Sequence, residues 1–197
     1  MKNKKICVIG LGYVGLPLAI NLSKYFKLVG FDKNKERISD LKSNIDITNE
    51  IKVSELKRSK ILFTCDPGDV QNCNVYIVTV PTPINSKKIP KITSLISVTK
   101  MIASNLKDND LIIYESTVFP GCTEEILIPL IEKFSKKKLN KNFYVGYSPE
   151  RIDPGESKYK LSNQVKVISG SSKKTVEKIK SIYKKIIKKD LFVAENI

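Results

Sequence analysis

The chain contains no histidine among its 197 residues. Ser-His-Asp and Cys-His catalytic groups are therefore excluded within this chain. The four cysteines are Cys7, Cys65, Cys73 and Cys122, and no two of them form a CxxC pair. A zinc site needs closely spaced cysteine or histidine ligands, and a disulfide framework needs a denser set of cysteines. We therefore expect no bound metal and no disulfide framework.

Long apolar runs are also missing. No run reaches the ~18–20 apolar residues that a membrane-spanning helix needs, although 41% of the residues are hydrophobic. The N-terminal sequence MKNKKICVIG is basic and then apolar, like the start of a signal peptide. Its apolar run is short, however, and a glycine motif follows directly. The sequence therefore predicts a cytoplasmic chain without a membrane partner.

Arginine is scarce, occurring at Arg37, Arg58 and Arg151 alone, so lysine supplies nearly all of the positive charge behind the net +15. A basic chain can bind nucleic acid through its phosphates. Such surfaces usually combine clustered basic residues with aromatic ones, and the lysines here are spread along the chain. We expect a solvated lysine-rich surface and no nucleic-acid partner, with a nucleic-acid-binding protein as the alternative.

Strand and helix patterns alternate along nearly the whole chain. Short apolar runs predict strands at 6–9, 28–31, 61–64, 75–80, 111–114, 143–146, 165–168 and 191–193. Amphipathic stretches predict helices at about 13–25, 33–42, 93–105, 122–136 and 172–188, with an interruption of the fourth near Pro129. This alternation is typical of an α/β fold: a doubly wound, mostly parallel Rossmann sheet with helices on both faces.

The first expected strand leads directly into the run GLGYVG at 10–15. Gly10 allows a tight turn out of the strand, Gly12 leaves the backbone open to a pyrophosphate, and Gly15 lets the next helix pack close to the strand. The free N–H groups at the start of that helix then face the phosphates. This arrangement predicts a dinucleotide site, with a glycine-rich turn that binds no nucleotide as the alternative.

Asp32 ends the second expected strand, 22 residues after Gly10. A carboxylate at this place accepts hydrogen bonds from the adenosine ribose. It also repels the 2′-phosphate of NADP, which favours NAD. Lys33 and Arg37 lie nearby and could offset that repulsion, so the sequence leaves the strictness of the choice open.

Three further segments follow expected strands, where open α/β sheets place their chemistry. Residues 80–83 read VPTP, and the hydroxyl of Thr82 lies between two prolines. Residues 114–121 read YESTVFPG and bring Ser116 and Thr117 to the same sheet edge. A rigid turn is the alternative interpretation of the first segment.

The third segment, residues 148–155, reads SPERIDPG. Glu150 could act as an acid or base and Arg151 could anchor an anion, whereas an exposed ion pair in a turn is the alternative. Cys122 lies just after the second segment, but no basic partner near it in sequence would activate it as a nucleophile.

Taken together, these segments resemble the N-terminal domain of the UDP-glucose/GDP-mannose dehydrogenase family, the nucleotide-sugar 6-dehydrogenases. The matching runs are IGLGYVGLPLA at 9–19, VPTP at 80–83, ESTVFPGCTEE at 115–125 and SPERIDPGE at 148–156. The resemblance covers essentially the whole chain, in order. The last two runs are most similar to members that oxidise UDP-N-acetylhexosamines.

The resemblance implies an activity. Members of the family oxidise the C6 alcohol of a nucleotide-linked sugar to a carboxylate, with two NAD and one water, in the synthesis of surface polysaccharide precursors. An aldehyde forms first, a cysteine adds to it, and the thioester that follows is hydrolysed, which divides one difficult oxidation into easier steps. NAD and a UDP-sugar are thus the implied ligands.

The resemblance also implies roles for residues of this chain. Those that would hold the adenosine and pyrophosphate of NAD are Gly10, Gly12, Tyr13, Val14, Gly15, Asp32 and Arg37, while Thr82 and Thr117 would lie near its ribose and nicotinamide. Thr117 and Glu150 would serve catalysis. Those that would line the substrate are Ser148, Glu150, Arg151 and Ile152.

Family members are about twice this length, and their nucleophilic cysteine, catalytic lysine and asparagine lie in later segments. We therefore expect residues 1–190 to form the NAD-binding domain and 191–197 to be a stub that leads to the family's central helix. Alone, this chain is expected to bind NAD without turnover. Since family homodimers form largely through that helix, this chain is expected to be monomeric or weakly associated.

Two alternatives of other kinds remain at this stage. The chain could be a non-catalytic dinucleotide-binding module that works with a partner chain. It could also belong to a two-domain dehydrogenase that acts on β-hydroxy acids and shares the glycine turn. The segment at 148–155 disfavours this last alternative.

Overall fold

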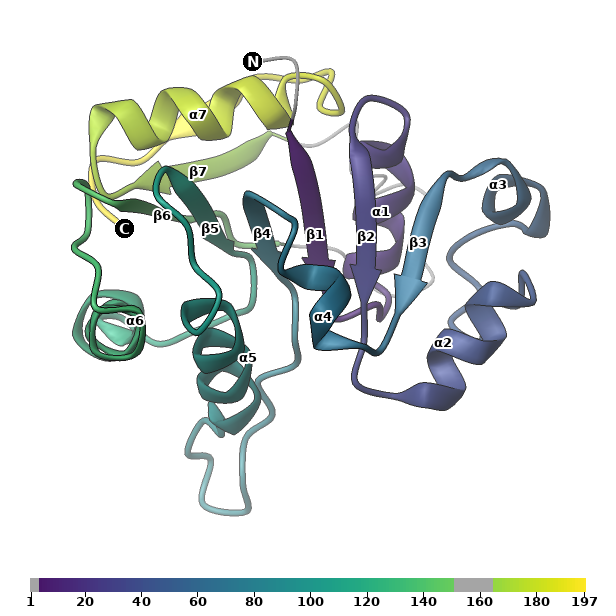
Figure 1. Ribbon diagram of the computed structural model, residues 1–197, viewed down its shortest axis with the longest axis horizontal. Helices are drawn as coiled ribbons and strands as arrows, with labels where there is room; N and C mark the ends of the chain where they lie inside the picture. The colour runs from purple at the N-terminus through teal and green to yellow at the C-terminus, as the bar shows by residue number, and fades with distance from the viewer. Residues whose placement is uncertain (1–3, 151–164) are drawn as a thin grey trace.

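The computed structural model describes residues 4–150 and 165–197, in which strands and helices alternate (Figure 1). The strands are β1 (Lys5–Ile9), β2 (Lys27–Phe31), β3 (Ile61–Thr64), β4 (Val75–Val78), β5 (Asp110–Tyr114), β6 (Phe143–Tyr147), β7 (Lys166–Gly170) and β8 (Leu191–Val193). The helices are α1 (Gly15–Ser23), α2 (Lys35–Lys42), α3 (Val53–Arg58), α4 (Pro67–Val70), α5 (Thr93–Ala103), the π-helical η1 (Cys122–Leu127), α6 (Ile128–Ser135) and α7 (Lys173–Tyr183). The alternation expected from the sequence is confirmed.

The strands form one sheet in the order β3-β2-β1-β4-β5-β6-β7-β8. Neighbouring strands are parallel except at β6 and β7, which run antiparallel with Gly146 opposite Gly170 and Tyr147 opposite Ser169. The predicted doubly wound, mostly parallel sheet is therefore confirmed. The chain adds strands on one side of β1 and then on the other, so the carboxyl ends of β1 and β4 flank the switch point where such sheets bind ligands.

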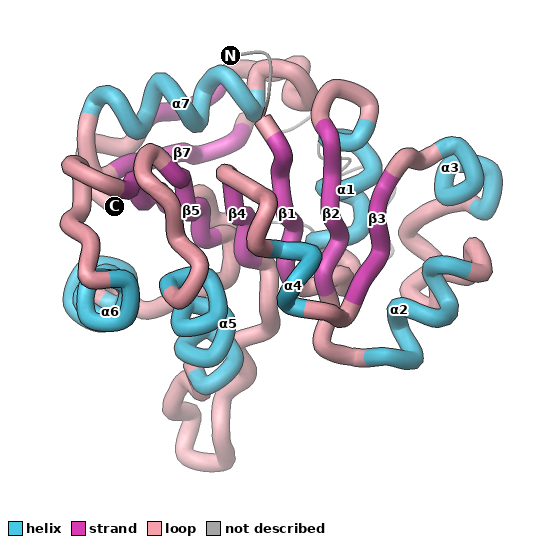
Figure 2. The backbone as a smooth tube through the Cα atoms, in the orientation of Figure 1, coloured by secondary structure: helices cyan, strands magenta, loops and turns pink. Residues whose placement is uncertain are grey.

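Helices lie on either side of the sheet (Figure 2), and apolar side chains bury both of its faces. In β1, Ile6 and Val8 point into the layer that contains α1 and α7. Cys7 and Ile9 point into the layer that contains α5, η1 and α6. This alternation follows from the two-residue period of a strand, and burial on both faces explains why the strands read as continuous apolar runs.

Some boundaries differ from those expected. β4 ends at Val78 rather than Val80, because the chain turns toward the VPTP loop after Thr79, whose N–H still donates to Ile9 O at 2.9 Å. α4 was not expected, since its four residues are too few to show a helical period. The helix after Gly121 begins with a π-helical turn, in which Ile128 N–H donates to Thr123 O. Pro129 has no N–H, which fits the irregular ladder there.

Near the C-terminus, β8 pairs with β7 in parallel and so belongs to the sheet. The division of the chain at residue 190 stays a prediction. In residues 4–150 and 165–197, no helix is both long and apolar enough to cross a membrane.

Candidate functional site

The glycine turn after β1 has the geometry that its sequence predicts. Gly10 has φ +94°, in the left-handed region that favours glycine. A Cβ at Gly15 would lie 1.8 Å from the carbonyl oxygen of Gly10 and 2.5 Å from the Thr79 hydroxyl oxygen. No side chain fits in that space. Helix α1 can therefore approach the turn this closely only because residue 15 is glycine.

Gly12 has the opposite environment, with no atom within 4 Å of the position that a Cβ would take. The backbone there faces open space, and the first hydrogen bond of the helix runs from Leu16 N–H to Gly12 O at 3.0 Å. Within the described part of the chain, no acceptor contacts the N–H groups of residues 12–15. These free donors and the positive end of α1 fit a pyrophosphate.

Asp32 lies directly after β2 and contacts the glycine turn. Its Oδ2 accepts a hydrogen bond from Leu11 N–H at 2.8 Å, and its Oδ1 accepts one from Asn34 N–H at 2.9 Å. A carboxylate oxygen can accept two hydrogen bonds, so each oxygen keeps a site for a further donor such as a ribose hydroxyl. Asp32 therefore also holds the turn in shape.

Arg37 lies on α2 and is buried, with 5% of its surface exposed. Its Nε donates to Leu11 O at 2.9 Å, and its Nη2 lies 2.8 Å from Asp46 Oδ1. In the structure it links α2 to the glycine turn. The role in adenosine binding that the resemblance implied stays a prediction. Among the described residues, neither Nη1 nor Nη2 makes a hydrogen bond of standard geometry, although Nη2 keeps its ion pair with Asp46.

Sequence reasoning missed Asp46, the partner of Arg37. Its carboxylate accepts hydrogen bonds from the backbone and hydroxyl of Thr48 and from the N–H groups of Glu50 and Ile51. Burial works to raise the pKa of Asp46, but the hydrogen bonds from Thr48 and Arg37 outweigh it and hold the pKa below its ordinary value. An aspartate with a threonine two positions later in a polar stretch signals a turn, although its arginine partner cannot be read from sequence.

Thr79 was also missed. Its hydroxyl donates to Gly10 O at 2.7 Å and lies 3.1 Å from Ile9 O. This contact ties the end of β4 to the glycine turn at the switch point. Its signal in the sequence is a hydroxyl residue at the end of an otherwise apolar strand.

The loops after β4 and β5 are joined by two hydroxyl groups. Thr82 donates to Thr117 O at 2.7 Å, and Ser116 donates to Val80 O at 2.7 Å. The structure thus brings Thr82 and Thr117 together, as their common place at strand ends predicted. Ser116 is buried and serves the loop contact, whereas Thr117 is exposed.

A buried charge cluster lies beside these loops and consists of Glu115, Glu150, Lys166 and Tyr183. Lys166 Nζ is 2.7 Å from Glu150 Oε2 and 3.1 Å from Glu115 Oε2. The hydroxyl of Tyr183 donates to Glu115 Oε1. Sequence reasoning found Glu150 but missed the other three. The available signal was a lysine within the apolar alternation of β7, since a charge on a buried strand needs a partner.

Burial and charge shift the pKa values in this cluster. Burial raises the pKa of the Glu115 carboxyl, and the Lys166 ammonium offsets this rise only in part. Burial works to lower the pKa of Lys166, but the carboxylates of Glu115 and Glu150 outweigh it and raise that pKa. Lys166 therefore carries its charge throughout the physiological range.

Ser148 is fully buried, and its hydroxyl donates inward to Val167 O at 2.7 Å. The structure therefore gives this side chain a partner in β7, and its place in the substrate lining stays a prediction. Arg151 and Ile152, the other two residues of that prediction, lie outside the described residues.

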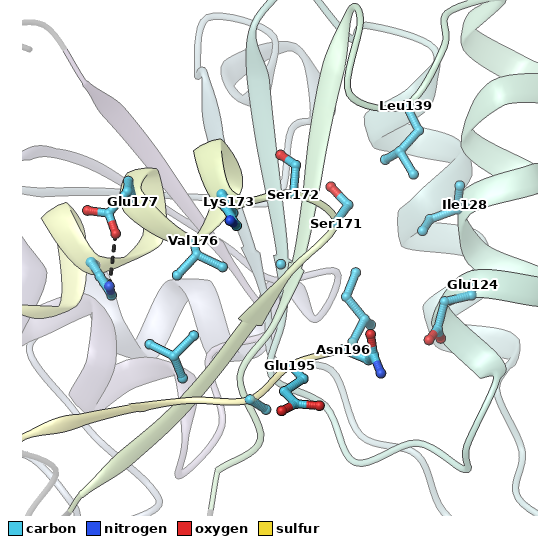
Figure 3. A pocket seen from close by; sticks show the side chains of 15 residues that line it. Glu124, Ile128, Leu139, Ser171, Ser172, Lys173, Val176, Glu177, Glu195 and Asn196 are labelled. Atoms are coloured by element: carbon cyan, nitrogen blue, oxygen red, sulfur yellow. Dashed lines mark hydrogen bonds and ion pairs between the residues drawn. The ribbon is translucent and has the colours of Figure 1, made fainter.

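The structure also has a pocket of about 930 Å³ (Figure 3). Its lining comes from η1, α6 and Leu139, from the end of β7 through Lys180 of α7, and from residues 193–197. None of the site residues expected from the sequence lines it. In the described ranges, 4–150 and 165–197, no three potential metal ligands come together.

The family model described as "UDP-glucose/GDP-mannose dehydrogenase family, NAD binding domain" matches residues 4–187. The chain belongs to this family. The resemblance seen in the sequence is confirmed, and so is the NAD cofactor, since the match is to the family's NAD-binding domain. The open backbone at Gly12 and the free N–H groups after it fit that cofactor.

Two relatives within the family are UDP-N-acetyl-D-glucosamine 6-dehydrogenases. The protein from Pseudomonas aeruginosa is 49% identical over 188 residues, which are 95% of this chain and 44% of that protein. The protein from Salmonella typhi is 46% identical over 194 residues, which are 98% of this chain and 46% of that protein. The chain thus spans about half the length of these relatives.

A solved structure of a family member has the same fold. The UDP-D-ManNAc dehydrogenase from Pyrococcus horikoshii superposes with a TM-score of 0.88 at 29% sequence identity, over 98% of this chain and 47% of that chain. The agreement therefore covers about half of that chain.

Proposed function

We propose that this chain is the NAD-binding part of a dehydrogenase that oxidises the C6 hydroxyl of a UDP-N-acetylhexosamine to a carboxylate, for surface polysaccharide precursors. The observation that carries the proposal is the 49% identity to a UDP-N-acetyl-D-glucosamine 6-dehydrogenase along 95% of the chain. The matching strand-end segments, with their hydroxyl and carboxylate side chains, support it.

The backbone of residues 12–15 would hold the pyrophosphate of NAD, because its N–H groups are free and Gly12 leaves room beside them. Asp32 would accept the ribose hydroxyls and oppose a 2′-phosphate. Thr82 and Thr117, joined by a hydrogen bond, would lie toward the nicotinamide. When bound, NAD supplies the hydride acceptor.

Glu150 would exchange a proton with the substrate or orient a water, since its carboxylate lies at the carboxyl edge of the sheet and is held by Lys166. Thr117 would contribute its hydroxyl from the neighbouring loop. The family's thioester chemistry needs a reactive cysteine. Cys7, Cys73 and Cys122 are buried and Cys65 is half-buried, and none of the four matches the position that the resemblance implies for the nucleophile. This chain alone is therefore proposed to bind NAD without turnover.

Calorimetry of the purified chain with NAD, NADP and UDP-N-acetylglucosamine tests the cofactor site. We expect NAD to bind more tightly than NADP. Asp32→Asn keeps one carbonyl acceptor but removes the charge, so it should weaken NAD binding and narrow the preference over NADP. Asp40→Asn, at the far end of α2, is the matched control and should leave both affinities unchanged. If neither dinucleotide binds, the cofactor site is wrong.

Absorbance at 340 nm tests the absence of turnover. The chain should produce no NADH from NAD and UDP-N-acetylglucosamine, even at high protein concentration. Steady NADH production by the purified chain would contradict this proposal. NADH production that appears only when a second polypeptide is added would favour a module that works with a partner chain.

A further inference from the structure

Lys166 connects the segment after β6 to the protein interior, because its ammonium contacts both Glu150 and the buried Glu115. β6 and β7 are antiparallel, with Tyr147 opposite Ser169. Continuing that register past the end of β6 puts Lys166 opposite Glu150, and their side chains meet at 2.7 Å. Oppositely charged side chains that face each other across two antiparallel strands stabilise their pairing. The place of Glu150 is therefore tied to a residue of the sheet.

The ammonium of Lys166 has all three of its donors engaged. It contacts Glu150 Oε2 at 2.7 Å, Glu115 Oε2 at 3.1 Å and the carbonyl oxygen of Ser148 at 3.4 Å. An ammonium group has three N–H donors, so acceptors from three directions fix its position. The side chain cannot turn away without losing at least one contact in a buried site.

The two carboxylates of the cluster differ in depth. The side chain of Glu115 is 0% exposed and also accepts the hydroxyl of Tyr183 from α7, whereas Glu150 is 7% exposed. Lys166 Nζ also lies 5.4 Å from the centre of the Tyr183 ring. Glu115 and Tyr183 thus form the deep side of the cluster, and Glu150 forms the side nearer the surface.

We propose that Lys166 is a positioning residue that holds the Glu150 carboxylate in place for proton exchange with the sugar substrate, while Glu115 and Tyr183 hold Lys166. The inference rests on the proposed function, because it takes the role of Glu150 from it. In the proton exchange, the O–H bond of the substrate breaks and the proton moves to a Glu150 oxygen. Lys166 itself gives up no proton.

The charged and titratable groups that face Lys166 come from three elements. Glu115 follows β5, Glu150 follows β6 and Tyr183 ends α7. Removing the ammonium takes away the 2.7 Å contact to Glu150 and the cation beside the buried Glu115 carboxylate. Like charges close together repel each other, so the Glu150 side chain should move from its place in the cluster.

Carbon-13 NMR of the side-chain carboxyl groups in the folded 197-residue chain at pH 7 tests this. Lys166→Met removes the charge and keeps most of the length of the side chain, and we expect the carboxyl resonance of Glu150 to move away from its wild-type chemical shift because its 2.7 Å contact is lost. Lys166→Arg retains a cation and should reverse at least half of that change. Lys180→Met, which removes a surface ion pair with Glu177 on α7, is the matched control and should cause no change.

Lys166→Met could unfold the chain, because it leaves Glu115 buried without its cation. The double variant Lys166→Met/Glu115→Gln removes both charges together and provides a folded background for the same measurement. An unchanged Glu150 carboxyl resonance in either folded variant would overturn the inference, since a purely structural lysine would alter stability alone. Failure of the wild-type chain to bind NAD would instead refute the proposed function and leave this measurement interpretable.

Discussion

The carbonyl oxygen of Leu11 accepts a hydrogen bond from Arg37 Nε at 2.9 Å, across 26 positions of the sequence. The N–H group of the same Leu11 donates to Asp32. One peptide of the glycine turn is thus held from both sides by the segment after β2. The shape of the cofactor site depends on these two side chains as well as on its glycines.

Replacing Arg37 tests that dependence. Arg37→Met removes the donor to Leu11 and leaves the buried Asp46 carboxylate without its ion pair, so the free energy of unfolding should fall by about 3 kcal/mol. Urea denaturation measures the change. Arg58→Met, on the exposed face of α3, is the control and should change stability by less than about 0.5 kcal/mol. If both variants change stability equally, Arg37 does not stabilise the glycine turn through Leu11 and Asp46.

Replacement by alanine should affect a different property at each of two glycines of the turn, namely stability at Gly15 and NAD affinity at Gly12. Gly15→Ala forces a methyl group into the space beside Gly10 O, so stability should fall by on the order of 3 kcal/mol. Gly12→Ala meets no atom and should leave stability within about 0.5 kcal/mol. Its methyl group instead enters the space proposed for the pyrophosphate, and NAD affinity should fall about tenfold or more, which costs about 1.4 kcal/mol.

Thermal denaturation and calorimetry separate the two outcomes for these glycines. If Gly12→Ala binds NAD as tightly as the wild-type chain, the pyrophosphate does not lie against residue 12, and the proposed placement is wrong.

Asp110 makes stability depend on pH. Burial raises the pKa of this carboxyl to about 6 in the folded chain, against an ordinary value of 3.8. Because the folded chain then binds the proton more tightly than the unfolded chain, this group's contribution to stability decreases as the pH rises from about 4 to about 6. Asp110→Asn should therefore stabilise the protein above pH 6 by about 1–2 kcal/mol.

Urea denaturation at several pH values between 4 and 7.5 measures the Asp110 effect. The difference in unfolding free energy between Asp110→Asn and the wild type should grow across the interval and then level off. If the difference in unfolding free energy stays constant with pH, Asp110 has the same pKa in the folded and unfolded chains, and the prediction is wrong.

The cysteines should differ in reactivity. Cys65 is half-buried, whereas Cys7, Cys73 and Cys122 are buried, and burial also raises the pKa of the Cys122 thiol. Iodoacetamide should therefore modify Cys65 first under native conditions, as mass spectrometry of the peptides would show. Cys65→Ser should remove the fast phase. Rapid alkylation of Cys122 would reopen its candidacy as a nucleophile.

The sequence predicts the fold well because its signals are local. Apolar runs and glycine turns fix the strands, and the positions of Gly10, Gly12 and Gly15 fix the turn. The placement of Thr82 and Thr117 at strand ends also follows from a general rule, since loops after neighbouring parallel strands meet at one edge.

The contacts that hold the site are not local, which is why sequence reasoning missed them. Thr79 reaches the glycine turn from β4, and Lys166 reaches Glu115 from a strand 51 positions away. The antiparallel direction of β7 also cannot be read from its residues, because the alternation of apolar side chains is the same in both directions.

The reversal of β7 has a consequence for redesign of this sheet. A version that kept every side chain but ran β7 parallel to β6 would place Lys166 at the amino edge of the sheet. A strand of five residues is about 17 Å long at ~3.3 Å per residue. The Lys166 ammonium would then lie roughly one strand length away from Glu150. Anyone who grafts this site onto another Rossmann scaffold must therefore copy the polarity of one strand along with the residues.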